Sequence, residues 1–271
     1  MNRIDALYRQ VRKKSSFALN VYLCAGNPSL GATRELILEM ERRGVDAIEL
    51  GMPFSDPVAD GPDLQPAHAR GVAAGITLRH VLALVRQVRE TSQIPIALMS
   101  YYNPIHYRGP ARLVAEAGAA GIDGLIVPDL PPDEADELIA AGREHDVKTI
   151  FFVAPTSTPD RVELVNRSAT GFIYCISVTG VTGARTSLPP ELAGELRALR
   201  QSTDKPLVVG FGVSTPQHVR AMAEVADGCI VGSAVARVIE SVLDAPLPEL
   251  LAAVGDFVDP LARAAHQSLP S

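Results

Sequence analysis

Three features are scarce or missing in this 271-residue sequence, and each absence excludes a class of protein. Only three cysteines occur, they lie far apart, and none forms a C-x-x-C pair. This spacing argues against a disulfide scaffold or zinc cluster and predicts buried free thiols (Cys24, Cys175 and Cys229) in a reducing, cytoplasmic compartment. No apolar run reaches the ~20 residues of a membrane-spanning helix. With 25 basic and 31 acidic residues, the chain also lacks the basic face that nucleic acids or membrane surfaces require.

Motifs of several enzyme classes are missing as well. No Gly-Lys dipeptide marks a Walker loop, and no serine lies in a G-x-S-x-G turn. Gly210 and Gly212 do not begin a dinucleotide fingerprint, because Thr215 stands in the place of its third glycine. The six histidines show no H-x-x-x-H spacing, so we expect no metal site, and we expect most of them on solvated helix surfaces.

Short apolar runs alternate with longer amphipathic runs along the whole chain. The predicted strands are Ala18–Cys24, Asp46–Leu50, Ile94–Met99, Gly124–Val127, Thr149–Val153, Phe172–Ile176, Leu207–Val209 and Cys229–Val231. The predicted helices between and after them are Thr33–Arg43, Leu78–Glu90, Ala111–Ala119, Asp133–His145, Pro159–Asn166, Pro190–Gln201, Pro216–Ala226 and Leu247–His266. Apolar strands that alternate with helices are typical of a parallel sheet buried on both faces.

Eight such units fit into the ~250 residues of a closed α/β barrel. We therefore predict one (β/α)8 TIM-barrel domain over residues 1–271, with an extra N-terminal helix before the first strand. An open doubly wound sheet would need a glycine-rich fingerprint after the first strand, and Gly26-Asn27-Pro28 is not one.

Two acidic residues lie near the carboxyl end of the second predicted strand, one within the strand and one in the loop after it. Such barrels carry their catalytic residues at this end. Glu49 lies on the same side of the strand as Ala47, so its carboxyl group points into the barrel mouth. Desolvation there raises a carboxyl pKa, which suits a general acid or base, although a paired structural carboxylate is the alternative. Asp60 lies in a loop rich in Pro and Gly, and its spacing fits a turn-forming aspartate as well as a functional one. Asp56 fits the turn-forming role better.

Glycines after the last two predicted strands form a second group of candidate residues. Gly212, Gly232 and Ser233 place bare N–H groups beside a helix that begins at about Ser233. Such N–H groups form the usual phosphate site of these barrels, and ordinary turn chemistry is the alternative. Without further information, Tyr174 at the end of an apolar strand is expected to pack in the core with its hydroxyl group hydrogen-bonded. The residues therefore indicate a phosphate-binding barrel enzyme with one or two carboxylates for proton transfer.

Residues 49–62 (ELGMPFSDPVADGP) closely resemble the signature of the tryptophan synthase alpha chain family. The resemblance covers nearly the whole chain, and its other motifs are LMSYYNP (98–104), VPDLP (127–131), GVTG (180–183), GFG (210–212) and GSA (232–234). It implies a carbon–carbon lyase that cleaves indole-3-glycerol phosphate to indole and glyceraldehyde 3-phosphate by a retro-aldol reaction. Indole then passes to a beta subunit for tryptophan synthesis.

The resemblance also implies roles for individual residues. Glu49 matches the general acid–base, Asp60 the carboxylate that accepts the indole N–H, and Tyr174 a supporting tyrosine. The positions that match the phosphate site are Gly183, Gly212, Gly232 and Ser233. The positions that match the substrate pocket and its lid are Tyr22, Thr182 and Phe211. In the family, the lid threonine meets the aspartate that corresponds to Asp60.

Family members carry no cofactor in this chain and assemble with a pyridoxal-phosphate-containing beta chain as an alpha2beta2 heterotetramer. The loop around Asp56, residues 103–104 and Pro131 match the docking face. Asn27 departs from the family, which commonly has Asp there.

Three other functions are alternatives to an alpha subunit in such a complex. They are a stand-alone lyase, a non-catalytic subunit that regulates a beta chain, and another phosphate-binding barrel enzyme. A phosphoribosyl isomerase or indole-glycerol-phosphate synthase would need other acid–base residues, and no predicted strand ends in the lysine that the synthase needs.

Overall fold

The computed structural model describes residues 1–176, 190–210 and 212–267. Within these residues, eight parallel strands close into a barrel in which each strand pairs with the next and β8 pairs with β1. The strands are β1 (Ala18–Cys24), β2 (Ala47–Gly51), β3 (Ile96–Met99), β4 (Gly124–Ile126), β5 (Lys148–Val153), β6 (Ile173–Ile176), β7 (Leu207–Gly210) and β8 (Gly228–Val231). The predicted fold class is confirmed.

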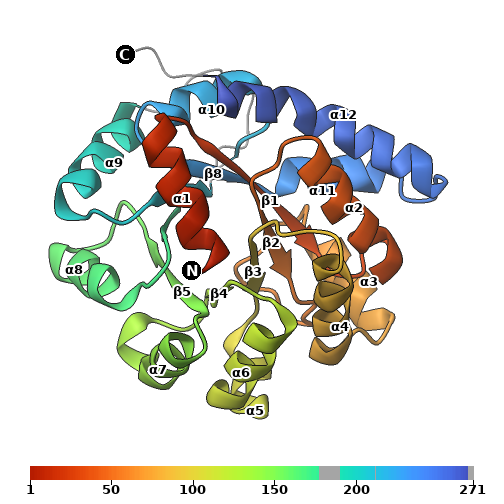
Figure 1. Cartoon of the computed structure of the whole chain (residues 1–271), viewed down its shortest axis with the longest axis horizontal. Coiled ribbons are helices and arrows are strands. Elements are labelled where there is room, and N and C mark those ends of the chain that lie inside the picture. The colour runs from red at the N-terminus through yellow and green to blue at the C-terminus, as the bar shows by residue number, and fades with distance from the viewer. Residues whose placement is uncertain (177–189, 211, 268–271) are drawn as a thin grey trace.

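Figure 1 shows most helices as an outer ring around the barrel, while α1 lies across the middle of the view. They are α1 (Arg3–Lys14), α2 (Leu30–Arg42), α3 (Gln65–Ala73), α4 (Leu78–Arg89), α5 (Tyr102–Arg108), α6 (Pro110–Ala120), the 3₁₀ turn η1 (Pro132–Glu134), α7 (Asp136–Glu144), α8 (Pro159–Ser168), α9 (Pro190–Ser202), α10 (Pro216–Ala223), α11 (Ser233–Ser241) and α12 (Leu247–His266).

The predicted strands are all present, and their bounds shift by at most two residues, as where β3 begins at Ile96 instead of Ile94. The predicted elements omit α3 and α5 altogether. Neither helix carries a long apolar stripe, since α5 is short and buries only Ile105, while α3 buries Ala67, His68 and Gly71. Helices without such a stripe give no periodic signal in the sequence.

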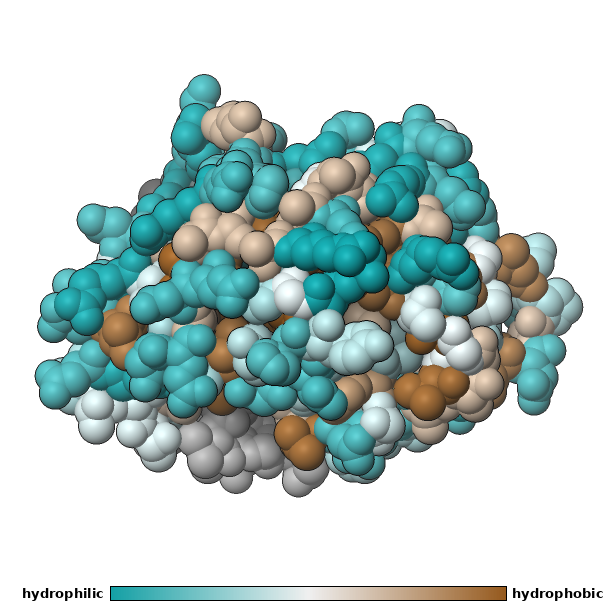
Figure 2. All heavy atoms as spheres, turned by 90° about the horizontal axis from the view of Figure 1, so that it is seen from below, coloured by the Kyte–Doolittle hydropathy of each residue, from teal (hydrophilic) through white to brown (hydrophobic). Residues whose placement is uncertain are grey.

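Alternation along the strands separates two apolar layers. Leu19 and Val21 of β1 belong to the cluster between barrel and helices, whereas Ala18 and Tyr22 belong to the cluster inside the barrel. Successive side chains of a strand point to opposite faces, so both layers are filled by the same strands. The face of the molecule seen in Figure 2 is mostly hydrophilic, with hydrophobic residues in scattered patches.

Helix α1 covers the end of the barrel where the strands begin (Figure 1). It buries Ile4, Tyr8 and Val11 against the inner cluster. Ile4 lies so close to Gly124, the first residue of β4, that a Cβ there would come within 2.9 Å of the Ile4 Cδ1 atom. The N-terminal helix therefore seals this end and leaves the opposite end for chemistry.

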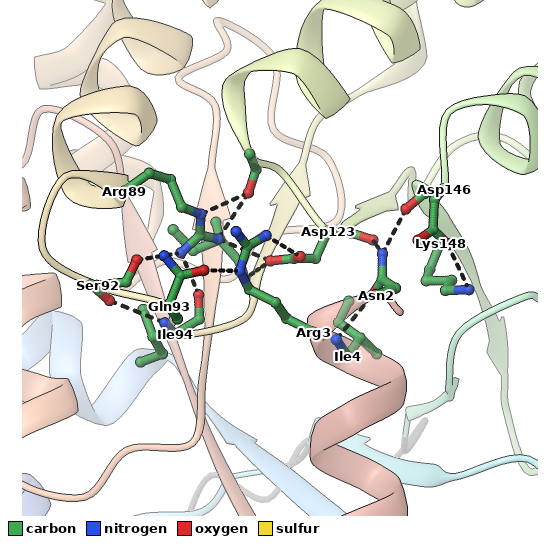
Figure 3. Close-up of polar contacts among 12 residues, drawn as sticks. Asn2, Arg3, Ile4, Arg89, Ser92, Gln93, Ile94, Asp123, Asp146 and Lys148 are labelled. Carbon is green, nitrogen blue, oxygen red and sulfur yellow. Dashed lines mark hydrogen bonds and ion pairs between the residues drawn. The ribbon is translucent and has the colours of Figure 1, made fainter.

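A polar cluster holds this seal in place (Figure 3). Asp123 is buried and accepts hydrogen bonds from Arg3 Nη1 (2.9 Å), Arg89 Nη2 (2.9 Å) and the Ile96 backbone N–H (2.8 Å). Asn2 adds a bond from Nδ2 to the Asp123 carbonyl oxygen at 2.9 Å. One carboxylate thus joins α1 and α4 to the starts of β3 and β4.

Asp123→Ala is expected to lower the free energy of unfolding by about 3 kcal/mol, because it leaves the Arg89 guanidinium buried without its carboxylate. Urea unfolding measures the loss. Asp133→Ala is the control, since its ion pair with Arg161 is exposed and its removal should barely move the midpoint. Equal effects of the two substitutions would contradict the role given to Asp123.

Candidate active site

A cavity of about 370 Å³ opens at the end of the barrel where the strands finish. It is lined by all the predicted site residues that the structure describes, namely Tyr22, Glu49, Asp60, Tyr174, Gly212, Gly232 and Ser233. The predicted residues Thr182, Gly183 and Phe211 lie outside the described residues. A larger cavity of about 520 Å³ lies between α8 and α9 and contains none of the predicted site residues, so size alone does not locate the chemistry.

Glu49 comes from the middle of β2, between Tyr22 of β1 and Ala97 of β3. Its side chain is buried inside the barrel, and among the described residues its one hydrogen-bond partner is the Tyr174 hydroxyl at 3.4 Å. Burial raises the pKa of Glu49 to about 8, the negative charge of Asp60 adds to the rise, and the Tyr174 hydrogen bond opposes it. The carboxyl group is therefore largely protonated at neutral pH and can donate a proton.

Tyr174 is held over the cavity floor by its neighbours. Its ring packs against Phe152 of β5, with the ring centroids 4.8 Å apart, and lies directly on Gly210. A Cβ at position 210 would come within 2.2 Å of the Tyr174 Cε1 atom, so only glycine leaves room for the ring. The tyrosine is thus packed, as its residue type alone indicates, and its hydroxyl also reaches the Glu49 carboxyl group.

Asp60 lies in the loop after β2 and is buried. The Tyr101 hydroxyl donates a hydrogen bond to Asp60 Oδ2, while the Ala59 backbone N–H donates to that hydroxyl at 2.9 Å. Phe54 stacks on the Tyr101 ring with the centroids 5.0 Å apart. The carboxylate is therefore anchored by a tyrosine from the end of the next strand, and Tyr101 is a site residue that the sequence reasoning did not single out.

The expectation that most histidines are solvated is wrong for His68. It lies on α3 and is almost fully buried. Its Nε2 atom lies 2.9 Å from the Tyr22 hydroxyl and 3.4 Å from Asp60 Oδ2, and its Nδ1 accepts the Phe54 N–H at 3.2 Å. The sequence offered no sign of this, because α3 itself carries no helical stripe that would place His68 against the barrel.

Helix α11 points its N-terminus at the other side of the cavity. Gly232 is its N-cap residue and Ser233 its first residue, and both line the cavity with Gly212. Gly212 has φ +48°, a conformation that favours glycine. The unpaired N–H groups and dipole of a helix N-terminus attract anions, so this wall suits a phosphate group.

Asn27, where the family commonly has Asp, lies in the loop after β1. Its side chain is buried and accepts a hydrogen bond from Arg70 Nε at 2.9 Å, and Arg70 also pairs with Glu240 of α11. The Asn27 amide oxygen therefore contacts Arg70, and the charge of this arginine is paired with Glu240.

Other predictions concern what the chain does not form. The three cysteines are free and buried, as predicted. Within residues 1–176, 190–210 and 212–267, no group of three or more His, Cys, Asp or Glu residues could hold a metal ion. No helix in the described part of the chain combines the length and apolarity needed to cross a membrane.

Comparisons with known proteins agree with this geometry. The family model described as tryptophan synthase alpha chain matches residues 8–259. The tryptophan synthase alpha chain of Geobacter sp. (strain M21) is 45% identical over 261 residues, which cover 96% of this chain and 97% of the relative.

Solved structures give the same result. Tryptophan synthase subunit alpha of Legionella pneumophila superposes with a TM-score of 0.90 at 35% identity and covers 98% of both chains. A chain of the tryptophan synthase alpha2beta2 complex of Pyrococcus furiosus gives a TM-score of 0.84 at 37% identity, with 92% of this chain and 98% of that one covered. The chain therefore belongs to the tryptophan synthase alpha chain family.

Proposed function

We propose that this protein is the alpha subunit of a tryptophan synthase and cleaves indole-3-glycerol phosphate to indole and glyceraldehyde 3-phosphate. The observation that carries the proposal is a buried, largely protonated Glu49 that shares one cavity with Asp60 and the N-terminus of α11. A proton donor, a carboxylate for the indole N–H and an anion site are the three groups that this carbon–carbon lyase reaction needs.

In the proposed reaction, Glu49 both donates and takes back the proton. The protonated carboxyl group gives its proton to indole C3, and the ring becomes an indolenine whose nitrogen gains positive charge. The resulting Glu49 carboxylate then takes the proton of the adjacent side-chain hydroxyl. The carbon–carbon bond breaks, its electron pair restores the indole ring, the aldehyde forms, and Glu49 is protonated again.

Asp60 and α11 hold the two ends of the substrate during these steps. The Asp60 carboxylate accepts the indole N–H and stabilises the positive charge that develops on the nitrogen. The first N–H groups of α11 bind the phosphate at the opposite wall. In the proposal, Gly183 joins the phosphate site, Phe211 the pocket wall, and Thr182 the lid that excludes water.

We also propose a beta-chain partner in an alpha2beta2 complex, which would carry the pyridoxal phosphate and use the indole. Two large apolar side chains are exposed on or beside the segments that the resemblance assigns to docking. Val58 is 82% exposed in the loop that contains Asp56, and Tyr107 of α5 is 93% exposed. In the proposed complex, the beta chain would bury these two side chains and remove their apolar surface from water.

Glu49→Gln is expected to lower indole release at least 10³-fold, on the order expected when an acid–base group is lost. The dissociation constant for glyceraldehyde 3-phosphate should stay within a few-fold, because α11 is untouched. In the unmodified chain, kcat/KM should fall as pH rises above about 8, where Glu49 loses its proton. Near-normal turnover of the variant, or a flat profile up to pH 10, would contradict the assignment.

The same substitution is expected to stabilise the fold in a pH-dependent manner. The pKa of Glu49 rises from 4.5 to about 8 on folding, so the natural chain loses stability as pH rises through this window. Gln has no proton to lose. The excess stability of the variant should thus grow from pH 4.5 to pH 8 by an amount on the order of a few kcal/mol. Urea unfolding of both proteins at pH 5 and pH 8.5 measures it, and a pH-independent difference would refute the burial argument.

Addition of a tryptophan synthase beta chain from one of the similar bacteria should raise the rate of indole release by this chain. Closure of loops over the substrate is the physical reason, because an ordered lid excludes water and completes the site. Rates with and without the beta chain, and with denatured beta chain as control, measure the effect. An unchanged rate together with proven binding would favour the stand-alone lyase instead.

A further inference from the structure

We propose that His68 is a positioning residue that orients Asp60 for the indole N–H while leaving its negative charge intact. The inference rests on the proposed function of Asp60 as the acceptor of that N–H. His68 does not line the cavity; it lies behind Asp60 on α3 and acts through it.

The hydrogen bonds of His68 define its protonation state. The Phe54 backbone N–H donates to Nδ1 at 3.2 Å, so Nδ1 must carry a lone pair and no proton. A doubly protonated ring has no acceptor and is excluded in this arrangement. His68 is therefore the neutral tautomer with its proton on Nε2.

That single Nε2–H faces two oxygen atoms. The Tyr22 hydroxyl oxygen lies 2.9 Å from Nε2 and accepts its hydrogen bond, while Asp60 Oδ2 lies 3.4 Å from the same nitrogen. The side chains of His68 and Asp60 are each 2% exposed, so water does not compete for this contact. The aspartate thus meets a fixed positive N–H dipole rather than a cation.

The two oxygen atoms of the Asp60 carboxylate therefore have different surroundings. Oδ2 receives the Tyr101 hydroxyl and faces the His68 N–H, whereas no described residue donates a hydrogen bond to Oδ1. Asp60 lines the cavity, so Oδ1 is the oxygen left to accept the substrate N–H. The Tyr101 hydrogen bond and the nearby His68 N–H dipole, both at Oδ2, fix the plane of the carboxylate.

Neutrality of the imidazole matters for the reaction. An imidazolium at this distance would form an ion pair with Asp60 and cancel much of the charge that stabilises a positive indole nitrogen. A neutral N–H orients the carboxylate and leaves its full charge for the substrate. The Phe54 N–H, by occupying Nδ1, keeps the imidazole in this state.

The test compares two non-cleavable ligands that differ only at the indole N–H. 3-(Indol-3-yl)propyl phosphate keeps the N–H, and 3-(benzofuran-3-yl)propyl phosphate replaces it by oxygen. The ratio of their dissociation constants reports how well Asp60 accepts the N–H. We expect His68→Leu to shrink this ratio by about fivefold to tenfold, a part of what a hydrogen bond to a charged group contributes, and His68→Gln to retain more of it because its amide still donates.

Two further variants separate the possible failures. Asp60→Asn should abolish the preference for the indole ligand, and His145→Leu, at an exposed histidine near the start of β5, should leave it unchanged. If Asp60→Asn keeps the preference, the proposed role of Asp60 fails. If Asp60→Asn loses it and His68→Leu weakens both ligands equally, Asp60 keeps its role and His68 is only a packing residue.

The protonation state of His68 can also be measured directly in the unmodified chain, so this test does not depend on the folding of a variant. In the ¹⁵N spectrum of histidine-labelled protein at pH 7.5, the His68 ring is expected to show a protonated Nε2 and an unprotonated Nδ1. An imidazolium or a proton on Nδ1 would overturn the proposal.

Discussion

The burial of one carboxyl group inside the barrel is the constraint on which the rest of the site depends. Water is excluded around Glu49, its pKa rises to about 8, and a side chain that is usually ionised becomes a proton donor at neutral pH. The negative charge of Asp60 adds to this rise. The site thus holds a carboxyl group of raised pKa beside a second acidic residue, an arrangement typical of acid–base chemistry.

The two ends of the barrel divide stability and chemistry between them. At the end where the strands begin, Asp123 is surrounded by donors and joins α1 to the barrel (Figure 3). At the end where they finish, Glu49 has one long hydrogen bond to a tyrosine and no cation among its described neighbours. A buried carboxyl group without a cation costs stability, whereas the Asp123 carboxylate has partners that satisfy its charge.

Much of this arrangement is predictable from the sequence, because it follows from local rules. Strand alternation alone turns Glu49 inward, and the glycine before the last barrel helix places Gly232 and Ser233 at the N-terminus of α11. The partners of Asp60 are not predictable in this way. Tyr101 and His68 reach it from a different strand end and from a helix without an apolar stripe, so only the folded chain brings them together. The role of Tyr174 came from the family resemblance, since its packing looks like that of any core tyrosine.

Direct titration of the Glu49 carboxyl group tests the central claim most closely. The carboxyl ¹³C signal of glutamate-labelled protein, assigned by its absence in Glu49→Gln, would be followed from pH 4 to pH 10 without substrate. The account predicts a midpoint near 8. A midpoint near that of a solvated glutamate, below about 5, would contradict it and remove the proton donor from the site.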